Sequence, residues 1–484
     1  MSNNTRLRFL TENEVSLMYD RCFQILTEKG IRVEYAKALK LFEKAGAMVD
    51  WDSENVRFPS DLIEQALKTA PRSFTVKGSH EKHDLTLPHA QGSFYTSTCV
   101  QSMKYHDYAT NRFVDVTTGR MAEWNQLAEV LPNIHKVAMQ TPMDVPRETA
   151  DIHGLKVQLE NTAKPLMVLA YCPETVEYMF ELMLAKAGSV EALRDRPMVL
   201  TYPTSLSPLK FKPMDMETIL QSCHYGVPMA VNSLAISGAT APVTLAGTAL
   251  LASVEILAMV VMAQIFKPGI PVVASVYTTT MDMATGNALL GNTESMLSRA
   301  VATQFIKESF NLPVETFSFM SDAYLSDGQA MVEKSLMPAM LDLAGSDIQY
   351  GCGRLGGPTS ASPIQMIIDD RIFTIIEKCN AKIPVNDDTL AFEEILANAP
   401  DGEFVSTEHT LKYCRESIRP DLFVANTMDQ WEAKGRKDLY ERAVEKYMEL
   451  KKDLQPQPLS EEVKREMTRI VKHADENLVG KLGK

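Results

Sequence analysis

Aromatic side chains recur where short apolar segments of this sequence end. Aromatic faces attract cations, by about 0.5–2 kcal/mol per ring, so gathered rings suit a quaternary ammonium, which cannot donate a hydrogen bond. A hydrolase would instead need paired carboxylates or a metal cluster, and histidines and acids are nearly missing here. The residues at these ends are Tyr95, Thr141, Tyr171, Tyr202, Asn232, Tyr277, Phe319 and Cys352, with Arg354 just beyond.

Three polar side chains add a second kind of chemistry to these rings. Arg354 lies in the glycine-rich turn 351–357, and its planar guanidinium matches the geometry of a carboxylate. Asn232 and Gln329 are suited to orient a carboxylate or a hydroxyl group. For Arg354 a structural salt bridge or a contact with a partner protein remains an alternative.

Four tyrosines are candidate walls of such an aromatic cage, namely Tyr95, Tyr202, Tyr277 and Tyr350. Ordinary core packing is the alternative for each of them taken singly. Two glutamates in helix-like segments, Glu255 and Glu333, are interpreted as structural hydrogen-bond anchors, because a buried carboxylate needs partners. Cys352 has no nearby histidine in the sequence and is interpreted as a small apolar residue.

The elements that would position these residues alternate regularly. Short apolar runs followed by helix-like segments indicate parallel βαβ units, and about eight of them favour a TIM (β/α)₈ barrel. An open doubly wound sheet remains possible. The expected strands are Phe94–Thr98, Lys136–Gln140, Leu166–Tyr171, Met198–Tyr202, Met229–Leu234, Val272–Tyr277, Val314–Phe319 and Ile348–Cys352. The helices expected between them include Thr175–Lys186, Leu245–Phe266, Glu294–Glu308 and Gln329–Leu343.

We predict three parts in the chain. Residues 1–92 form an N-terminal helical segment, residues 93–380 the barrel with a β-hairpin near 102–117, and residues 381–484 a charged helical C-terminal extension. The apolar stretch from Val243 to Phe266 has the length of a membrane span. Because it lies between strand-like segments, we interpret it as a buried barrel helix.

Composition narrows the class of protein. The 484 residues are 45% apolar, with a formal net charge of -13 and no long basic tract, which argues against a nucleic-acid partner. The seven cysteines include no CxxC pair, and no cysteine and histidine cluster has zinc-finger spacing, so we expect free thiols and no bound metal. The N-terminus lacks the apolar core of a signal peptide, so we expect a cytoplasmic protein.

From Gly119 onward the chain resembles the trimethylamine methyltransferase family, which includes pyrrolysine-containing archaeal enzymes and bacterial homologues without pyrrolysine. Each matching segment is weak alone, but they occur in family order. They are Asn161–Pro165, Pro203–Leu209, Ser237–Gly247 with Glu255, Pro268–Gly269 through Thr278–Asp282 and Gly286, Ser321–Ala323 with Gln329, Glu333 and Lys334, and Tyr350–Leu355.

The resemblance implies a reaction and a partner. In the pyrrolysine enzymes the special residue stands two positions before the Ser-Asp-Ala element, and Phe319 occupies that position here. The chain therefore resembles the bacterial branch, whose members demethylate betaines such as glycine betaine, proline betaine, carnitine or γ-butyrobetaine. The methyl acceptor would be the Co(I) of a corrinoid protein. Phe319 is the first candidate for substrate contact, with barrel packing as the alternative, and Arg354 is the candidate for a betaine carboxylate.

Two other functions remain open at this level. A barrel lyase or hydrolase could use Arg354 and Asn232 to bind a small anionic substrate, and it would need no cobalamin. A non-catalytic protein could bind quaternary amines with the same aromatic residues. Among substrates, we favour proline betaine or another compact betaine over trimethylamine. The chain could also form a homo-oligomer.

Overall fold

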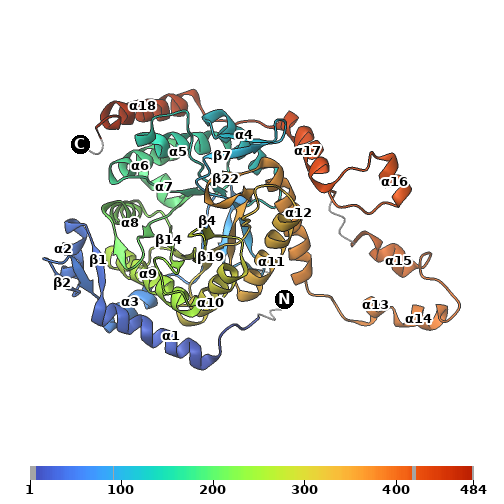
Figure 1. Ribbon diagram of the computed structural model, residues 1–484, viewed down its shortest axis with the longest axis horizontal. Helices are drawn as coiled ribbons and strands as arrows, with labels where there is room; N and C mark the ends of the chain where they lie inside the picture. The colour runs from blue at the N-terminus through green and yellow to red at the C-terminus, as the bar shows by residue number, and fades with distance from the viewer. Residues whose placement is uncertain (1–6, 91, 417–420, 482–484) are drawn as a thin grey trace.

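A closed ring of parallel strands forms the centre of the molecule (Figure 1). This computed structural model describes residues 7–90, 92–416 and 421–481. Within that part, eight strands follow one another round the ring in chain order, and a parallel bridge between Ser97 and Lys136 closes it. They are β6 (Tyr95–Thr98), β9 (Val137–Ala138), β10 (Leu166–Val168), β11 (Val199–Thr201), β14 (Met229–Ser233), β16 (Val272–Val276), β19 (Val314–Phe317) and β20 (Ile348–Cys352). The barrel prediction is confirmed, and closure excludes the open sheet.

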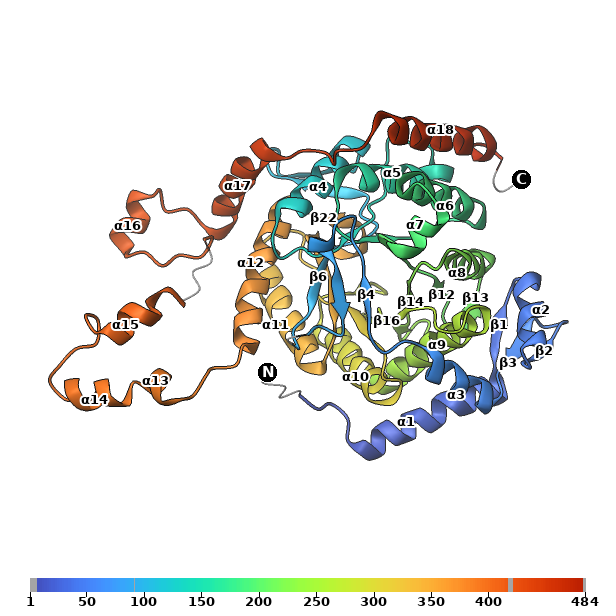
Figure 2. The same ribbon diagram turned by 180° about the vertical axis from the view of Figure 1, so that it is seen from behind.

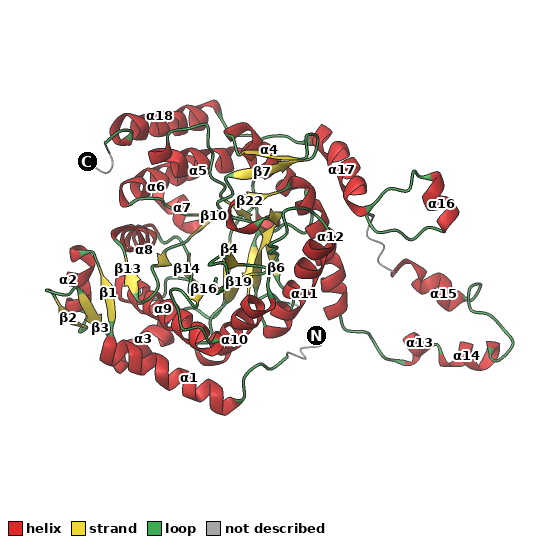
Figure 3. Ribbon diagram, viewed as in Figure 1, coloured by secondary structure: helices red, strands yellow, loops and turns green. Residues whose placement is uncertain are grey.

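A helix follows each strand and covers the outside of the ring (Figure 3). These helices are α4 (Thr118–Val130), α5 (Ala150–Asn161), α6 (Pro173–Ala187) with the short α7 (Val190–Asp195), α8 (Pro213–Tyr225), α9 (Leu245–Phe266), α10 (Thr293–Ser309), α11 (Gly328–Ala344) and α12 (Pro363–Asn380). Both faces of each strand are therefore covered, which explains why the strands are continuous apolar runs rather than alternating ones.

Sequence and structure agree on these elements and differ at their ends. The predicted bounds of β20 and α9 are those observed, whereas most other predicted strands run one to three residues too far. The surplus residues, such as Leu169–Tyr171 after β10, lie in the loops at the carboxyl ends. They look like strand because loops that cover a barrel mouth also bury apolar side chains.

The N-terminal segment was predicted to be helical, but it also contains strands. Besides α1 (Glu12–Gln24), α2 (Ala36–Lys44) and α3 (Ser60–Thr69), it contains the strands β1 (Ile31–Val33), β2 (Met48–Asp50) and β3 (Asn55–Arg57), which join β13 (Lys210–Phe211) in a small sheet. A second small sheet pairs β4 (Phe74–Val76) with β5 (Leu85–Leu87). Three-residue strands are too short to show a period of two, so periodicity could not predict them.

The N-terminal helices explain the apolar stretch that resembles a membrane span. The most apolar 18-residue window of helix α9 has a mean hydropathy of 2.2, and 78% of this window is buried. Helices α1 and α3 pack against α9. It is the one described helix that is long and apolar enough to span a membrane, and its burial makes it a core helix, as predicted. Buried on nearly all sides, such a helix has no polar face.

The remaining elements lie at the edges of the barrel. The predicted hairpin is β7 (Lys104–Asp107) with β8 (Arg112–Asp115), and it is extended by β22 (Ser360–Ala361) and β21 (Arg354–Leu355). Shorter strands in the loops are β12 (Thr204–Ser205), β15 (Ile236–Ser237), β17 (Thr279–Met281) and β18 (Ala288–Leu289). After α12, Figure 2 shows the short helices α13–α16 (387–433) projecting from the barrel before α17 (Leu439–Leu450) and α18 (Glu461–Leu478) return to it.

Candidate functional site

Three aromatic rings meet at the carboxyl end of the barrel. Tyr277 directly follows β16, Phe317 ends β19, and Tyr350 is the register partner of Phe317 on β20. The ring centroids of Tyr277 and Phe317 are 3.9 Å apart, and those of Phe317 and Tyr350 are 4.3 Å apart. Phe317 and Tyr350 are buried, while Tyr277 is partly exposed, so Tyr277 is the ring nearest to solvent. The carboxyl end of the strands is where TIM barrels hold their active sites.

Arg354 is buried beside this cluster, with 1% of its surface exposed. Its guanidinium donates to Val100 O and Pro358 O and, at 3.2 Å, to Ser102 Oγ. These bonds fix it between the end of β20 and the loop after β6. Its Nε has no hydrogen-bond partner, and no carboxylate of the described residues forms an ion pair with it. A buried cation compensated only by neutral acceptors is unusual, because desolvating a charge is costly.

A second buried guanidinium, Arg299 of α10, flanks the same rings. It donates to Thr278 O at 2.7 Å and to Phe317 O at 3.0 Å, and it lies 5.8 Å from the centroid of Phe317. Burial lowers the pKa of Arg299 to about 10. Among the described residues it too has no ion pair, since Asp322, the nearby acid, accepts instead from the backbone of residues 290 and 291. Sequence reasoning missed Arg299, although an arginine inside a buried helix was a readable signal.

Both guanidiniums act on Tyr277. Burial raises the pKa of Tyr277 to about 12, against an opposing effect of Arg354 and Arg299. The tyrosine therefore stays neutral, close to both guanidiniums and to Asp322, whose effect opposes theirs. Asn232, at the end of β14, contributes a buried oxygen: its Nδ2 donates to Thr204 Oγ1 at 3.3 Å, whereas its Oδ1 has no partner.

Deeper in the barrel, Tyr202 belongs to a buried cluster in which a positive and a negative side chain compensate each other. Lys136 and Glu315, both 0% exposed, form an ion pair, and the Tyr202 hydroxyl lies against both of them. Burial lowers the pKa of Lys136 even though Glu315 opposes this. Tyr202 is thus engaged inside the protein. Sequence reasoning did not single out Lys136 or Glu315, although a charge within a predicted buried strand requires a partner.

Three predicted residues lie away from the three-ring cluster. Tyr95 begins β6, so its assignment to a carboxyl end was wrong, and its ring contacts His89 and His135. Phe319 is fully buried in the apolar core that lies against α4 and α12. Gln329 is exposed at the start of α11, where it donates to Glu333.

The two predicted structural glutamates do hold loops in place. Glu255 accepts hydrogen bonds from the hydroxyls of Ser205, Ser207 and Ser233 and from Leu209 N, so one carboxylate of α9 ties together the loops after β11 and β14. Glu333 accepts from Asp322 N at 3.0 Å and orders the loop after β19.

The glycine-rich turn places Arg354 through backbone geometry. Gly353 has φ +86°, and a Cβ on it would lie 2.4 Å from Trp124 Cη2. Cys352, just before it, is buried, and burial raises the pKa of its thiol well above the usual value, as expected for an apolar role. Among the described residues, no group of three or more histidine, cysteine, aspartate or glutamate side chains could hold a metal ion.

Comparison with known proteins finds enzymes that are similar to this chain over nearly its whole length. The trimethylamine methyltransferase MttB of Methanosarcina barkeri is 30% identical, over 99% of this chain and 97% of its own. A protein of the same name from Desulfitobacterium hafniense is 27% identical over 96% and 94%. The glycine betaine methyltransferase of Desulfitobacterium hafniense is 25% identical over 95% of each chain.

Solved structures agree on the fold. The monomethylamine methyltransferase MtmB of Methanosarcina barkeri superposes with a TM-score of 0.53 at 12% identity, covering 90% of this chain and 92% of its own. The model of the trimethylamine methyltransferase (MTTB) family matches residues 1–478. With these matches and a barrel that carries its candidate site at the carboxyl end, the chain belongs to the trimethylamine methyltransferase family and is a methyltransferase.

Proposed function

We propose that this methyltransferase removes a methyl group from a small carboxylated quaternary amine and transfers it to the Co(I) of a corrinoid protein in the cytoplasm. The observation that carries the proposal is the pair of buried guanidiniums, Arg354 and Arg299, with no carboxylate paired to either in the described chain. Positive potential at a buried site favours a ligand that brings its own negative group.

Charge balance favours a betaine over a simple amine. A bare cation such as a methylated ammonium would enter a region that two guanidiniums already make positive. A betaine is neutral as a whole, so its carboxylate can face Arg354 while its ammonium faces the ring of Tyr277. The unpartnered Asn232 Oδ1 is consistent with this, because methyl groups on a positive nitrogen make weak C–H···O contacts but cannot donate an N–H.

The residues would bind and orient the substrate rather than move protons. A quaternary amine leaves as a neutral tertiary amine, so the step needs no general acid. The corrinoid supplies the nucleophile when its carrier protein is bound. The chain contributes an orientation that points one N–CH₃ bond out of the barrel, together with exclusion of water from the cation.

The choice among betaines is a further part of the proposal. The similarity to a glycine betaine methyltransferase supports the class. We favour a compact betaine such as proline betaine, because Phe317 and Tyr350 fill the barrel below Tyr277. Phe319 is fully buried in the apolar core against α4 and α12, so we propose that it contributes to barrel packing and does not contact the ammonium directly.

An anaerobic spectrum tests the reaction. The purified chain is mixed with Co(I)alamin and, one at a time, glycine betaine, proline betaine, carnitine, γ-butyrobetaine and trimethylamine. We expect loss of the Co(I) absorption and formation of methylcobalamin with one betaine and not with trimethylamine. Turnover of trimethylamine alone would overturn the carboxylate assignment. Betaine binding by calorimetry without any methyl transfer would instead indicate a binding protein.

A further inference from the structure

Apolar side chains are exposed in an unusual concentration after the barrel. Of the 29 large apolar residues that are exposed in the described chain, 12 lie between Ile383 and Met428. We call residues 381–433 the arm. Its first part includes Phe392, 57% exposed, Leu396, 60% exposed, and Leu411, 75% exposed. No described residue from 381 to 415 is buried. Soluble monomers rarely expose a contiguous apolar surface of this kind.

The arm stands away from its own barrel (Figure 1). Its short helices are α13 (Asp387–Leu390), α14 (Phe392–Asn398), α15 (Glu408–Tyr413) and α16 (Met428–Ala433). The side-chain hydrogen bonds of the first part stay within it, as where Lys412 and Tyr413 both bind Asp388. The first three of these helices border an open groove of about 1010 Å³, whose lining combines apolar side chains such as Leu390 and Phe392 with charged ones such as Asp387 and Glu408.

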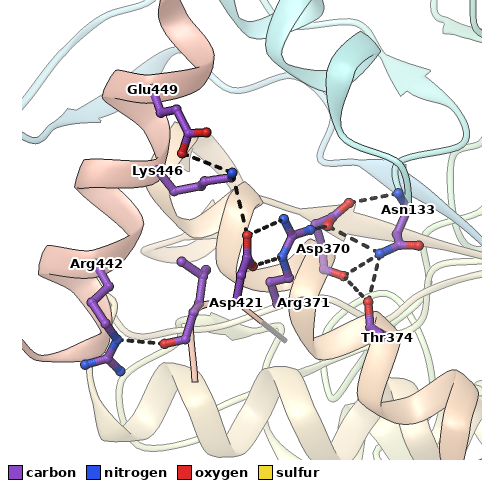
Figure 4. A network of polar contacts seen from close by, with 9 residues as sticks. Asn133, Asp370, Arg371, Thr374, Asp421, Arg442, Lys446 and Glu449 are labelled. Atoms are coloured by element: carbon purple, nitrogen blue, oxygen red, sulfur yellow. Dashed lines mark hydrogen bonds and ion pairs between the residues drawn. The ribbon is translucent and has the colours of Figure 1, made fainter. Parts of the chain in front are cut away.

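The arm is fixed to the barrel at its start and again at residues 421 and 422. It starts where α12 ends, and Asp421 then binds Arg371 of α12 at 2.5 Å and approaches Lys446 of α17 at 3.6 Å (Figure 4). Beside it, Leu422 is 3% exposed and its carbonyl accepts from Arg442. The described residues from 381 to 415 are therefore held out from the body, and their own barrel does not cover them.

The exposed area of the whole chain is too large for a compact monomer. A chain of 53.9 kDa should expose about 18,000 Å² by the scaling of surface with mass. This chain exposes 21622 Å². The surplus of about 3,600 Å² is more than the roughly 1,000–2,500 Å² that each protomer of an obligate homodimer commonly buries, so it is large enough for such an interface.

We propose that the arm is an exchange arm that packs on a second copy of this chain. Obligate interfaces are more apolar than those of partners that must dissociate in each cycle, and the described part of the arm exposes 12 large apolar side chains. Its place also argues against the corrinoid carrier as occupant. Barrel helices run opposite to the strands, so α12 ends near the amino-terminal face, whereas a methyl acceptor must reach the carboxyl face.

Exposed apolar side chains on the barrel indicate the surface that receives the arm. In a two-fold dimer each copy both gives and receives an arm, so each barrel carries one receiving surface. The neighbouring helices α11 and α12 expose Val332, Leu336 and Ile375 to 64%, 49% and 41%. Val332 and Leu336 are one turn apart and share a face of α11. We assign this face as the receiving surface.

Sedimentation equilibrium of the full chain tests the proposal, with three pairs of substitutions. The arm pair is Phe392→Asp with Leu396→Asp, and the receiving pair is Val332→Asp with Leu336→Asp. The control pair, Leu17→Asp with Met48→Asp, changes side chains that are 54% and 45% exposed on the N-terminal segment. All six side chains are exposed, so none of these substitutions should change the melting temperature of the folded monomer.

We expect wild type and the control pair to sediment at twice 53.9 kDa or a higher even multiple. The arm pair and the receiving pair should each raise the dissociation constant at least about 100-fold. A wild-type monomer at 50 µM (about 1,000-fold above a tight dimer constant), or an oligomer that the arm pair leaves intact, would overturn the proposal. If only the receiving pair has no effect, the assignment to α11 and α12 is wrong.

Thiol labelling gives an independent readout at the arm itself. Cys414 is exposed in the single chain, on the arm just after α15. In concentrated wild-type protein we expect Cys414 to react slowly with a maleimide. After dilution, or in the variant with the arm pair of substitutions, Cys414 should react at the rate of an exposed thiol. Equal labelling rates at high and low concentration would contradict burial of the arm.

Discussion

Two buried cations in this barrel differ in how their charge is compensated. Lys136, deep in the ring, is paired with Glu315 and lies against the Tyr202 hydroxyl. Arg354, at the carboxyl end, is equally buried but is bound only by backbone carbonyls and Ser102. Burying a charge without a counter-charge is costly, so proteins usually avoid it.

The difference separates structure from function within one fold. The inner cluster is complete without any ligand, and it fills the barrel with a neutral pair. The outer site has two guanidiniums, an aromatic group and an unpartnered amide oxygen, and we propose that a carboxylate of the substrate supplies the counter-charge to Arg354. A cost that folding leaves uncompensated is a common sign of a binding site. Four predictions test this contrast, in order of decreasing effect.

The largest effect should come from Lys136→Met, which leaves Glu315 buried without its cation. We expect a loss of about 3–5 kcal/mol in the free energy of unfolding, measured in urea. The double variant Lys136→Met with Glu315→Gln removes both charges and should recover most of that loss. A single variant as stable as wild type would mean that the pair does not compensate itself.

A carboxyl without a cation should make stability depend on pH. Asp151 accepts from Tyr171 N and from Thr175, and burial raises its pKa to about 6. The unfolded residue ionises near pH 4, so between about pH 4 and 6 the folded state holds more protons and stability falls as pH rises, by at most about 1.4 kcal/mol per unit. Melting curves of Asp151→Asn should lack this component. Parallel pH profiles of variant and wild type would refute it.

Removing the outer charge should affect binding of a carboxylate specifically. For Arg354→Gln we expect the Kd of the betaine substrate to rise about 10- to 100-fold, the value of a hydrogen bond between charged groups. The methyl ester of the same betaine, which has no carboxylate, should bind both proteins alike. The exposed Arg21→Gln serves as the matched control. Equal losses for betaine and ester, measured by calorimetry, would assign Arg354 a purely structural role.

The smallest effect concerns the ring of Tyr277. Tyr277→Leu should weaken betaine binding about 2- to 30-fold, whereas Tyr277→Phe, which keeps the ring, should bind nearly as wild type. The neutral isostere 3,3-dimethylbutyrate has carbon in place of the charged nitrogen, so its binding should hardly respond to the loss of the ring. If Tyr277→Leu weakens the binding of both ligands equally, Tyr277 contributes apolar contact only.

Most of the fold could be predicted from the sequence because barrel strands are recognisable as short apolar runs. Eight apolar runs separated by helices can bury both faces only in a parallel sheet, and the predicted bounds of β20 and α9 are those observed. The small N-terminal sheet was not predictable, since β1, β2 and β3 are three residues each and pair with β13, which lies far away in the chain.

The candidate site was predictable only in part. Tyr277, Tyr350, Asn232 and Arg354 lie near or just beyond the carboxyl ends of their strands, and their contact with a substrate stays a prediction. Tyr95 does not, because it begins its strand instead of ending it. Arg299 was missed because it comes from a covering helix and reaches the mouth by the length of its side chain.

Residue types and their periodicity determined by themselves that parallel strands alternate with helices, that α9 is buried, and that an arginine follows the last strand, while closure of the strands into a barrel was decided by the structure. Only the tertiary structure decided which charges are compensated. Lys136 and Glu315 are 179 residues apart, and the partners of Arg354 include a carbonyl 254 residues away. Local sequence fixes backbone preference and burial, but a counter-charge is supplied by whichever distant strand the closed ring brings alongside.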